Sequence, residues 1–262
     1  MAATDRPHDP RITVIQQELF DERRSKADKY RDLVIGRPGW GPLVVFELVT
    51  LVASWVPGAL GLLLRARLYP LVLGRVGRNV VFGANVTLRH PHKIAIGDSV
   101  VIDDQCCLDA KGTDNRGIVI GDGVFVGRNT ILSCKNGDIV LEDRANLGFN
   151  CEIFSAATVR VGADVLMAAY TYLVGGDHLY DRTDVPVLQQ GRTARGIDIG
   201  AGAWLGAHVV VTDGSNVGRD AIIGAGAVVV GAIPEYAIAV GTPAKVIRDR
   251  RTTDAPSPVP SP

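Results

Sequence analysis

One histidine stands where the regular pattern of the chain is interrupted. Residues 174–196, VGGDHLYDRTDVPVLQQGRTARG, form a 23-residue stretch that contains His178 with Asp177 and Asp181 close by. Long loops in compact repeats usually carry function. A neutral imidazole with a pKa of about 6.5 can take a proton from a hydroxyl group near neutral pH. These residues favour a general base at His178, with either aspartate or a backbone carbonyl to orient the ring; an ordinary polar loop residue is the alternative.

The segments on either side of this loop repeat every six residues. From residue 199 an aliphatic residue recurs at each sixth position through residue 229, and glycine directly follows four of them. This period matches neither a helix nor an alternating strand, and it predicts a solenoid of hexapeptide units rather than a β-sandwich with coincidental spacing. Three hexads would form one coil, and about seven coils ~4.8 Å apart would make a prism roughly 34 Å tall. The small residue after each aliphatic residue is expected at a corner, where glycine tolerates unusual dihedral angles. The same register appears upstream at Val76, Phe82, Leu88, Ile96, Ile102, Leu108, Ile120, Val126, Leu132, Leu141, Leu147, Ile153, Val161, Met167 and Leu173.

Three motifs identify a family resemblance that covers roughly residues 76–250. They are VLMAAYTYLVGGDH, which ends at His178, then GAWLGAHVVV, and the closing segment IGAGAVVVGAIPEYAIAVGTPAKVIR. Together they resemble the left-handed β-helix acyltransferases with hexapeptide repeats, and most closely the galactoside, maltose and polysaccharide O-acetyltransferases. The resemblance implies an all-β, left-handed parallel β-helix, a homotrimer, and acetyl-CoA held in the groove between neighbouring subunits, with no metal. It also implies that His178 is the catalytic base for a saccharide acceptor.

The same resemblance assigns the remaining site residues. Ala207 and Ala225 match positions whose backbone contacts the pantetheine arm, and both are small enough for close approach of a ligand. Lys245 and Arg248 match basic positions that meet the coenzyme phosphates, and Trp204 is expected to line the groove. On the acceptor side, the coils next to the loop carry Asn150, Glu152, Tyr170 and Tyr172.

The chain departs from the family pattern in two places. Val230 and Gly231 stand where the family often has a Thr-Lys pair that reaches the coenzyme, so Arg250 or Arg251 would have to replace that contact. Gly148 stands where the sugar acetyltransferases use an asparagine for acceptor binding. This second departure disfavours a simple galactoside or maltose acceptor.

The flanking segments divide the chain into a helical N-terminal extension (1–70), the β-helix (71–250) and a Pro/Ser-rich tail expected to be disordered (251–262). Residues 11–34 suggest an exposed helix. Residues 43–63 are strongly apolar, but Glu47 and the Pro57-Gly58 break disfavour a simple membrane-spanning helix. Two short apolar helices there would contact a membrane surface or a lipid-linked glycan, or else cover the end of the solenoid.

Composition narrows the remaining choices. The formal net charge of the 262-residue chain is zero, so charge gives no support for nucleic-acid binding. The four cysteines form no C-x-x-C pair and no secretory signal opens the chain, which predicts reduced thiols and a cytoplasmic protein, with contact to the cytosolic face of a membrane through 43–63.

The main hypothesis is an O-acetyltransferase acting on a cell-envelope polysaccharide or glycolipid intermediate. The alternatives are N-acetylation of an amino sugar or nucleotide sugar, a longer acyl donor, a metalloenzyme of the γ-carbonic anhydrase kind, and a non-catalytic scaffold. His90, His92 and His208 rank below His178, and the first two are weaker candidates for substrate contact.

Overall fold

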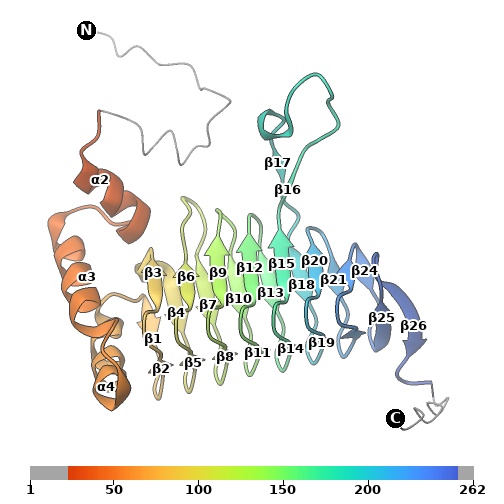
Figure 1. Cartoon of the computed structure of the whole chain (residues 1–262), viewed down its shortest axis with the longest axis horizontal. Helices are drawn as coiled ribbons and strands as arrows, with labels where there is room; N and C mark the ends of the chain where they lie inside the picture. Colours follow the sequence, from red (N-terminus) through yellow and green to blue (C-terminus); the bar gives the residue numbers. More distant parts are fainter. Residues whose placement is uncertain (1–22, 253–262) are drawn as a thin grey trace.

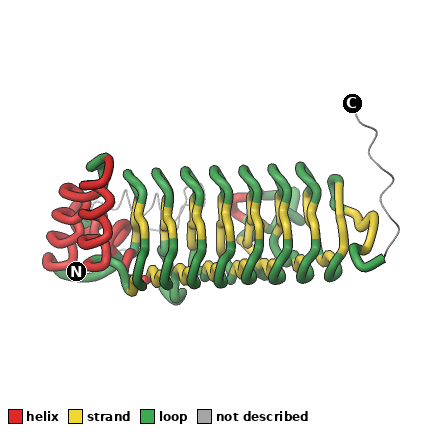
Figure 2. Tube along the Cα trace, turned by 90° about the horizontal axis from the view of Figure 1, so that it is seen from below, coloured by secondary structure: helices red, strands yellow, loops and turns green. Residues whose placement is uncertain are grey.

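The computed structural model describes residues 23–252 and shows a parallel β-solenoid capped by helices at one end (Figure 1). The predicted left-handed parallel β-helix is confirmed. Each coil contributes one strand to each of three sheets, here called A, B and C. Seven coils are complete, and an eighth contributes only to sheets A and B. Figure 2 shows the coils stacked side by side along the long axis.

The strands are short, because each covers one flat side of a narrow coil. Sheet A contains β1 (Arg75–Val76), β4 (Ile94–Ile96), β7 (Ile118–Ile120), β10 (Ile139–Leu141), β13 (Val159–Val161), β18 (Ile197–Ile199), β21 (Asn216–Val217) and β24 (Ala232–Ile233). Sheet B contains β2 (Val81–Phe82), β5 (Val101–Ile102), β8 (Phe125–Val126), β11 (Asn146–Leu147), β14 (Leu166–Met167), β19 (Trp204–Leu205), β22 (Ile222–Ile223), β25 (Ala237–Val240) and the antiparallel β26 (Lys245–Asp249). Sheet C contains β3 (Thr87–Arg89), β6 (Cys107–Asp109), β9 (Ile131–Cys134), β12 (Glu152–Ser155), β15 (Tyr172–Gly175), β20 (Val210–Thr212) and β23 (Val228–Val229).

The core consists of the aliphatic residues that define the period of six. In sheet C the register aligns Leu132, Ile153, Leu173 and Val211 in one column, and all four are fully buried. Each upstream block of three likewise supplies one inward residue to each sheet of its coil. No single coil can bury its own apolar side, so the fold is stabilised by stacking of neighbours.

The corners correct one expectation about glycine. The glycines that follow the aliphatic residues do not adopt left-handed backbone; the left-handed position falls two residues later, at residues such as Asn150, Tyr170 and His208. Gly206 is required for a different reason, since a Cβ there would lie 2.6 Å from the backbone nitrogen of Ala225 in the next coil. These glycines therefore permit close approach of successive coils.

The helical cap covers the first coil. It comprises α2 (Lys26–Tyr30), the π-helix η1 (Arg31–Ile35), α3 (Trp40–Ala53), α4 (Gly58–Leu68) and the 3-10 helix η2 (Tyr69–Leu71). Arg65 is 2% exposed and fastens the cap to the solenoid, because its Nε donates to the Phe82 carbonyl (2.8 Å) and its Nη1 to the Val56 carbonyl (2.7 Å).

The two predicted apolar helices are confirmed as α3 and α4, separated at Pro57. Among residues 23–252, no helix is long and apolar enough to cross a membrane. Of the predicted 11–34 helix, residues 26–35 are helical and residues 11–22 lie outside the described part. Residues 253–262 of the predicted tail also lie outside it.

Candidate functional site

The interruption predicted around His178 is a projecting hairpin. After β15, the chain leaves the edge of sheet C and forms β16 (Asp177–His178), which pairs antiparallel with β17 (Arg192–Thr193). Figure 1 shows this hairpin standing out from the solenoid near its middle, and the 3-10 helix η4 (Val187–Gln189) lies within its loop. The base of the hairpin is tight, since a Cβ on Gly176 would lie 2.6 Å from the Ala156 side chain.

His178 is partly buried on this hairpin, opposite Arg192. Its Nδ1 is buried and has no hydrogen-bond partner among residues 23–252. The Asp177 carboxylate accepts the backbone N–H of His178 at 2.7 Å. Neither Asp177 nor Asp181 hydrogen-bonds the imidazole ring within the described chain, so the structure selects neither as the residue that orients it.

The predicted coenzyme positions lie at the opposite edge of sheet C. We call the turns from sheet B strands to sheet C strands the B–C corner, and the segments from sheet C strands to sheet A strands the C–A corner. Ala207 and Ala225 occupy equivalent places at the B–C corner of successive coils, whereas His178 extends from the C–A corner. Ala225 and the adjacent Gly226 are exposed, and a Cβ on Gly226 would meet no atom within 4 Å. The B–C corner therefore carries small residues and is open to solvent, so an extended ligand could lie close to its backbone.

Two predicted acceptor residues share the B–C corner with the alanines. Asn150 and Tyr170 both take the left-handed position of their coils, at φ 55° and 62°. The Tyr170 ring stacks on the His208 ring with centroids 4.8 Å apart and an interplanar angle of 3°, and Phe149 meets Tyr170 edge-on at 6.0 Å. This stack of aromatic rings was not predicted; its signal in the sequence is a bulky residue, Tyr170 and then His208, at the same corner position of consecutive coils.

The other two predicted acceptor residues lie on the outer face of sheet C. Glu152 and Tyr172 are aligned in neighbouring strands, β12 and β15. Burial raises the pKa of the Tyr172 hydroxyl, and the adjacent Glu152 carboxylate raises it further. This pair thus lies between the B–C corner and the edge that leads to His178.

The predicted basic residues lie on the closing strand β26. Lys245 and Arg248 are both exposed there. The Ala244 N–H donates to the Val228 carbonyl at 2.7 Å, which holds the beginning of β26 beside the coil that carries Ala225. Trp204 lies on strand β19 of sheet B, is 48% exposed, and belongs to the same coil as Ala207.

Arg250 and Arg251 already have partners inside the chain. Arg250 donates to the Asp220 carbonyl at 2.6 Å. Arg251 pairs with Asp249 at 2.6 Å and lies over the Tyr236 ring at 4.8 Å. Both are thus directed to another corner of the solenoid, away from Ala225.

His90 and His92 join the cap to the first coil. The His90 Nε2 lies 2.8 Å from the Asp32 carbonyl, and a Cβ on Gly36 would lie 2.6 Å from the same ring. Burial lowers the pKa of both, to about 4 for His92 with Arg37 as a further cause. These contacts assign His90 and His92 to packing between the cap and the first coil, and they do not support the hypothesis that the two residues contact substrate.

The cysteines are free, and three of them, Cys106, Cys134 and Cys151, are buried. Burial raises the pKa of each of these three thiols, to about 12 for Cys106 and about 11 for Cys134. They are therefore held as neutral core side chains, as expected.

Comparison with known proteins agrees with this architecture. The family described as the hexapeptide repeat of succinyl-transferase matches residues 196–230, the stretch in which the period of six is longest. The chain is 36% identical over 132 residues to Rv3034c of Mycobacterium tuberculosis, named as a probable acetyltransferase; the match covers 50% of this chain and 44% of that protein. This chain resembles the hexapeptide-repeat acyltransferases.

Two further comparisons extend the resemblance. WbbJ of Escherichia coli, whose name describes an O-acetyl transferase of lipopolysaccharide biosynthesis, is 29% identical over 155 residues, covering 56% of this chain and 78% of WbbJ. The N-acyltransferase AntD from Bacillus cereus, solved with dTDP and coenzyme A, superposes with a TM-score of 0.52 at 20% identity, covering 76% of this chain and 92% of AntD. The likeness to AntD concerns the fold alone. The match to Rv3034c spans less than half of that protein.

Proposed function

We propose that this protein is an acetyl-CoA-dependent O-acetyltransferase that modifies a saccharide hydroxyl, with His178 as the general base. The observation that carries the proposal is the placement of His178 on a hairpin that interrupts an otherwise regular hexapeptide solenoid. The names of Rv3034c and WbbJ, an acetyltransferase and an O-acetyl transferase, support the reaction class.

The reaction needs one proton acceptor and two aligned substrates. The acceptor oxygen attacks the thioester carbonyl carbon while its proton passes to the His178 imidazole. The carbon–sulfur bond then breaks, and coenzyme A leaves as a thiolate, which requires no strong acid. Binding both substrates in one groove supplies the orientation, and Glu152 and Tyr172 are placed to contact the saccharide.

The separation of His178 from the B–C corner favours a shared site. Ala207 and Ala225 lie across the width of sheet C from the His178 hairpin, so one chain does not bring the two sets together. A homotrimer would place the corner of one subunit against the hairpin of its neighbour. In that assembly, Lys245 and Arg248 would meet the coenzyme phosphates beside Ala225, and Trp204 would line the same groove.

We further propose that the protein acts at the cytosolic face of a membrane, and exposed apolar side chains of the helical cap support contact with a membrane surface. Large apolar side chains are exposed on α3, including Trp40 (67%) and Leu51 (68%), and in the connection to α4, at Trp55 (63%). An exposed apolar helix face with tryptophans suits insertion into the headgroup region. Flotation of the full chain with anionic vesicles should be lost in Leu51→Gln/Trp55→Gln; equal flotation of both proteins would contradict this part of the proposal.

The reaction is tested by thiol release from acetyl-CoA with a panel of sugars, nucleotide sugars and lipid-linked glycans. We expect acceptor-dependent release, and a fall of about 10²–10⁴-fold in kcat for His178→Ala. Gln189→Ala, on the exposed part of the same hairpin, is the matched control and should keep full activity. Undiminished release by His178→Ala would contradict the proposed base, and acetylation of an amine only would favour the N-acetyltransferase alternative.

A further inference from the structure

A group of cations lies along the C–A corner between the helical cap and the His178 hairpin. Arg89 and Lys111 approach the buried carboxylate of Asp109, and Lys135 lies within electrostatic reach of all three and of Arg192. The Asp109 Oδ2 lies 3.1 Å from the Lys111 Nζ and 3.7 Å from an Arg89 Nη1. One carboxylate cannot neutralise four cations, so the cluster keeps an excess of positive charge.

Within residues 23–252, Lys135 and Arg192 are the members of this cluster that no salt bridge reaches, whereas Arg89 and Lys111 both approach Asp109. The Lys135 Nζ lies 5.8 Å from the centre of the Phe154 ring. Burial lowers the pKa of Lys135, and Lys111, Arg89 and Arg192 lower it further, with only Asp109 opposing. An anion bound here would relieve this repulsion and form charge-assisted hydrogen bonds.

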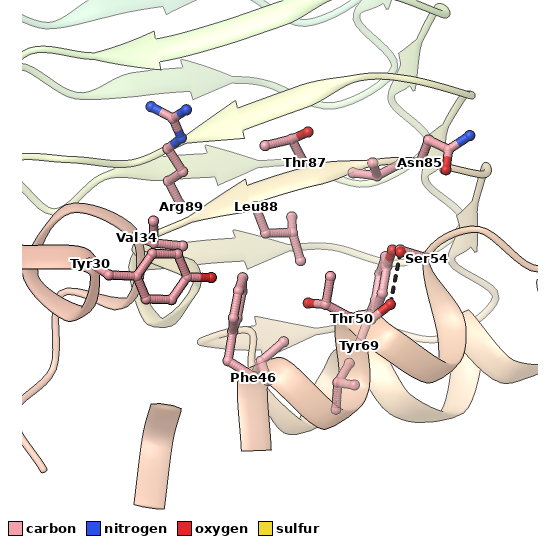
Figure 3. Close-up of a pocket in the computed structure, with 13 residues that line it drawn as sticks. Tyr30, Val34, Phe46, Thr50, Ser54, Tyr69, Asn85, Thr87, Leu88 and Arg89 are labelled. Carbon is pink, nitrogen blue, oxygen red and sulfur yellow. Dashed lines mark hydrogen bonds between the residues drawn. The ribbon is translucent and has the colours of Figure 1, made fainter. Parts of the chain in front are cut away.

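A cavity adjoins the same cluster at the first coil. It has a volume of about 370 Å³ and lies between the cap and β3. Its lining is mixed, with apolar residues that include Val49, Val86 and Leu88 and polar residues that include Ser54 and Asn85. Figure 3 shows Arg89 at the rim of this cavity, with its guanidinium group turned away from the helices. The cavity and the cations are therefore continuous along one edge of the molecule.

The three features follow one another along the solenoid. The cavity lies at the first coil, the cations extend over the first three coils, and His178 follows the fifth coil through β15. Arg192 connects the last two features, since it pairs with His178 across the hairpin. Four steps of ~4.8 Å separate the first and fifth coils, or about 19 Å.

We propose that the acceptor saccharide is linked through a phosphate group to a hydrocarbon chain. The chain occupies the cavity beneath the cap, the phosphate lies on Lys135 and its neighbours, and the saccharide reaches His178. This inference rests on the proposed function for the role of His178, but the binding of a lipid phosphate does not depend on it.

Direct binding of dodecyl phosphate, held below its micelle concentration and followed by calorimetry on the full chain, tests the site without turnover. We expect it to bind at least about tenfold more tightly than dodecyl maltoside, which lacks the phosphate, and than UDP, which lacks the chain. UDP binding as tightly as dodecyl phosphate would replace the lipid by a nucleotide sugar and overturn the proposal.

Variants assign the two halves of the site. Lys135→Gln should weaken dodecyl phosphate binding about tenfold, whereas Arg144→Gln, an exposed arginine at another corner, should not. Thr50→Phe, which fills the cavity, should reduce binding at least as much. Leu51→Phe, on the exposed face of the same helix, controls for adsorption to the outer surface.

The outcomes separate the two proposals. Unchanged dodecyl phosphate binding in Lys135→Gln together with weaker coenzyme A binding would mean that the cations serve the donor, and would overturn this inference. Thiol release with neutral saccharides but no binding of dodecyl phosphate would overturn it while preserving the transferase. Specific dodecyl phosphate binding without thiol release from any acceptor would leave the lipid site in place and contradict the proposed reaction.

Discussion

The two edges of sheet C are built from the same repeat but differ in regularity. At the B–C corner the coils continue without interruption, and small or aromatic residues such as Ala207, Ala225 and Tyr170 recur at equivalent places. At the C–A corner the chain departs from the repeat and carries His178 together with the cations around Lys135. A regular edge offers a uniform surface for a long ligand, whereas an irregular edge provides titratable groups. The proposed site takes its coenzyme surface from the first edge and its general base from the second.

The largest effect on the regular edge is expected from Ala207→Trp. An indole at this corner would occupy the surface assigned to the pantetheine arm, so the KM for acetyl-CoA should rise at least about tenfold, or ~1.4 kcal/mol. Steady-state thiol release at varied acetyl-CoA measures it. Ala201→Trp, at a partly exposed corner between sheets A and B, is the control. Equal kinetics for both variants would show that the B–C corner is not the coenzyme surface.

A smaller effect is expected from Tyr170→Ala, which removes the stacking partner of His208. Aromatic pairs contribute about 0.5–1.5 kcal/mol beyond their buried area. If the exposed tyrosine also contacts the acceptor, the acceptor KM should rise more than the thermal midpoint falls. Thermal unfolding and acceptor kinetics of Tyr170→Ala and Tyr170→Phe compare the two roles. A loss confined to stability would assign Tyr170 to packing only.

The smallest expected effect is on the pH dependence of stability, and it comes from His92, which packs at the C–A corner and has no role in the proposed reaction. Burial holds the pKa of His92 at about 4, below its unfolded value near 6.5. The unfolded chain therefore binds more protons between these values, and His92 lowers stability as the pH falls from about 6.5 to 4. His92→Gln should flatten this dependence in thermal unfolding without changing kcat at pH 7.5. An unchanged pH profile would contradict the buried, neutral state of His92.

The sequence predicted the solenoid well because its signal is local and repeated. Every inward aliphatic residue named from the period of six lies in a strand, and the break before residue 197 is the observed hairpin. The glycines after the aliphatic residues were wrongly expected to adopt unusual dihedral angles. They are needed because successive coils approach closely, as Gly206 and Ala225 do, and such contacts join residues that lie far apart in the sequence. The stack of Tyr170 on His208 was missed for the same reason.

The candidate site was less predictable than the fold. His178 could be found because it interrupts the pattern, but its separation from Ala207 across sheet C became visible only once the coils were folded. The cluster around Asp109 joins residues from 89 to 192, and their distances along the chain follow no fixed spacing. Such a cluster depends on the register of stacked coils and on the return of the hairpin, neither of which the period reveals.

The central claim is that His178 acts on coenzyme held by the corner of another subunit. The most direct test mixes His178→Ala with Ala207→Trp after unfolding and joint refolding, and measures acceptor-dependent thiol release. With acetyl-CoA kept well below its KM, Ala207→Trp alone should keep at most about a tenth of the wild-type rate, and His178→Ala far less. Random assembly should restore about a quarter of the wild-type sites, since each shared site then draws its two halves independently from the two chains. Activity that stays at the level of the separate variants, in mixed oligomers verified by mass, would contradict a site shared between subunits.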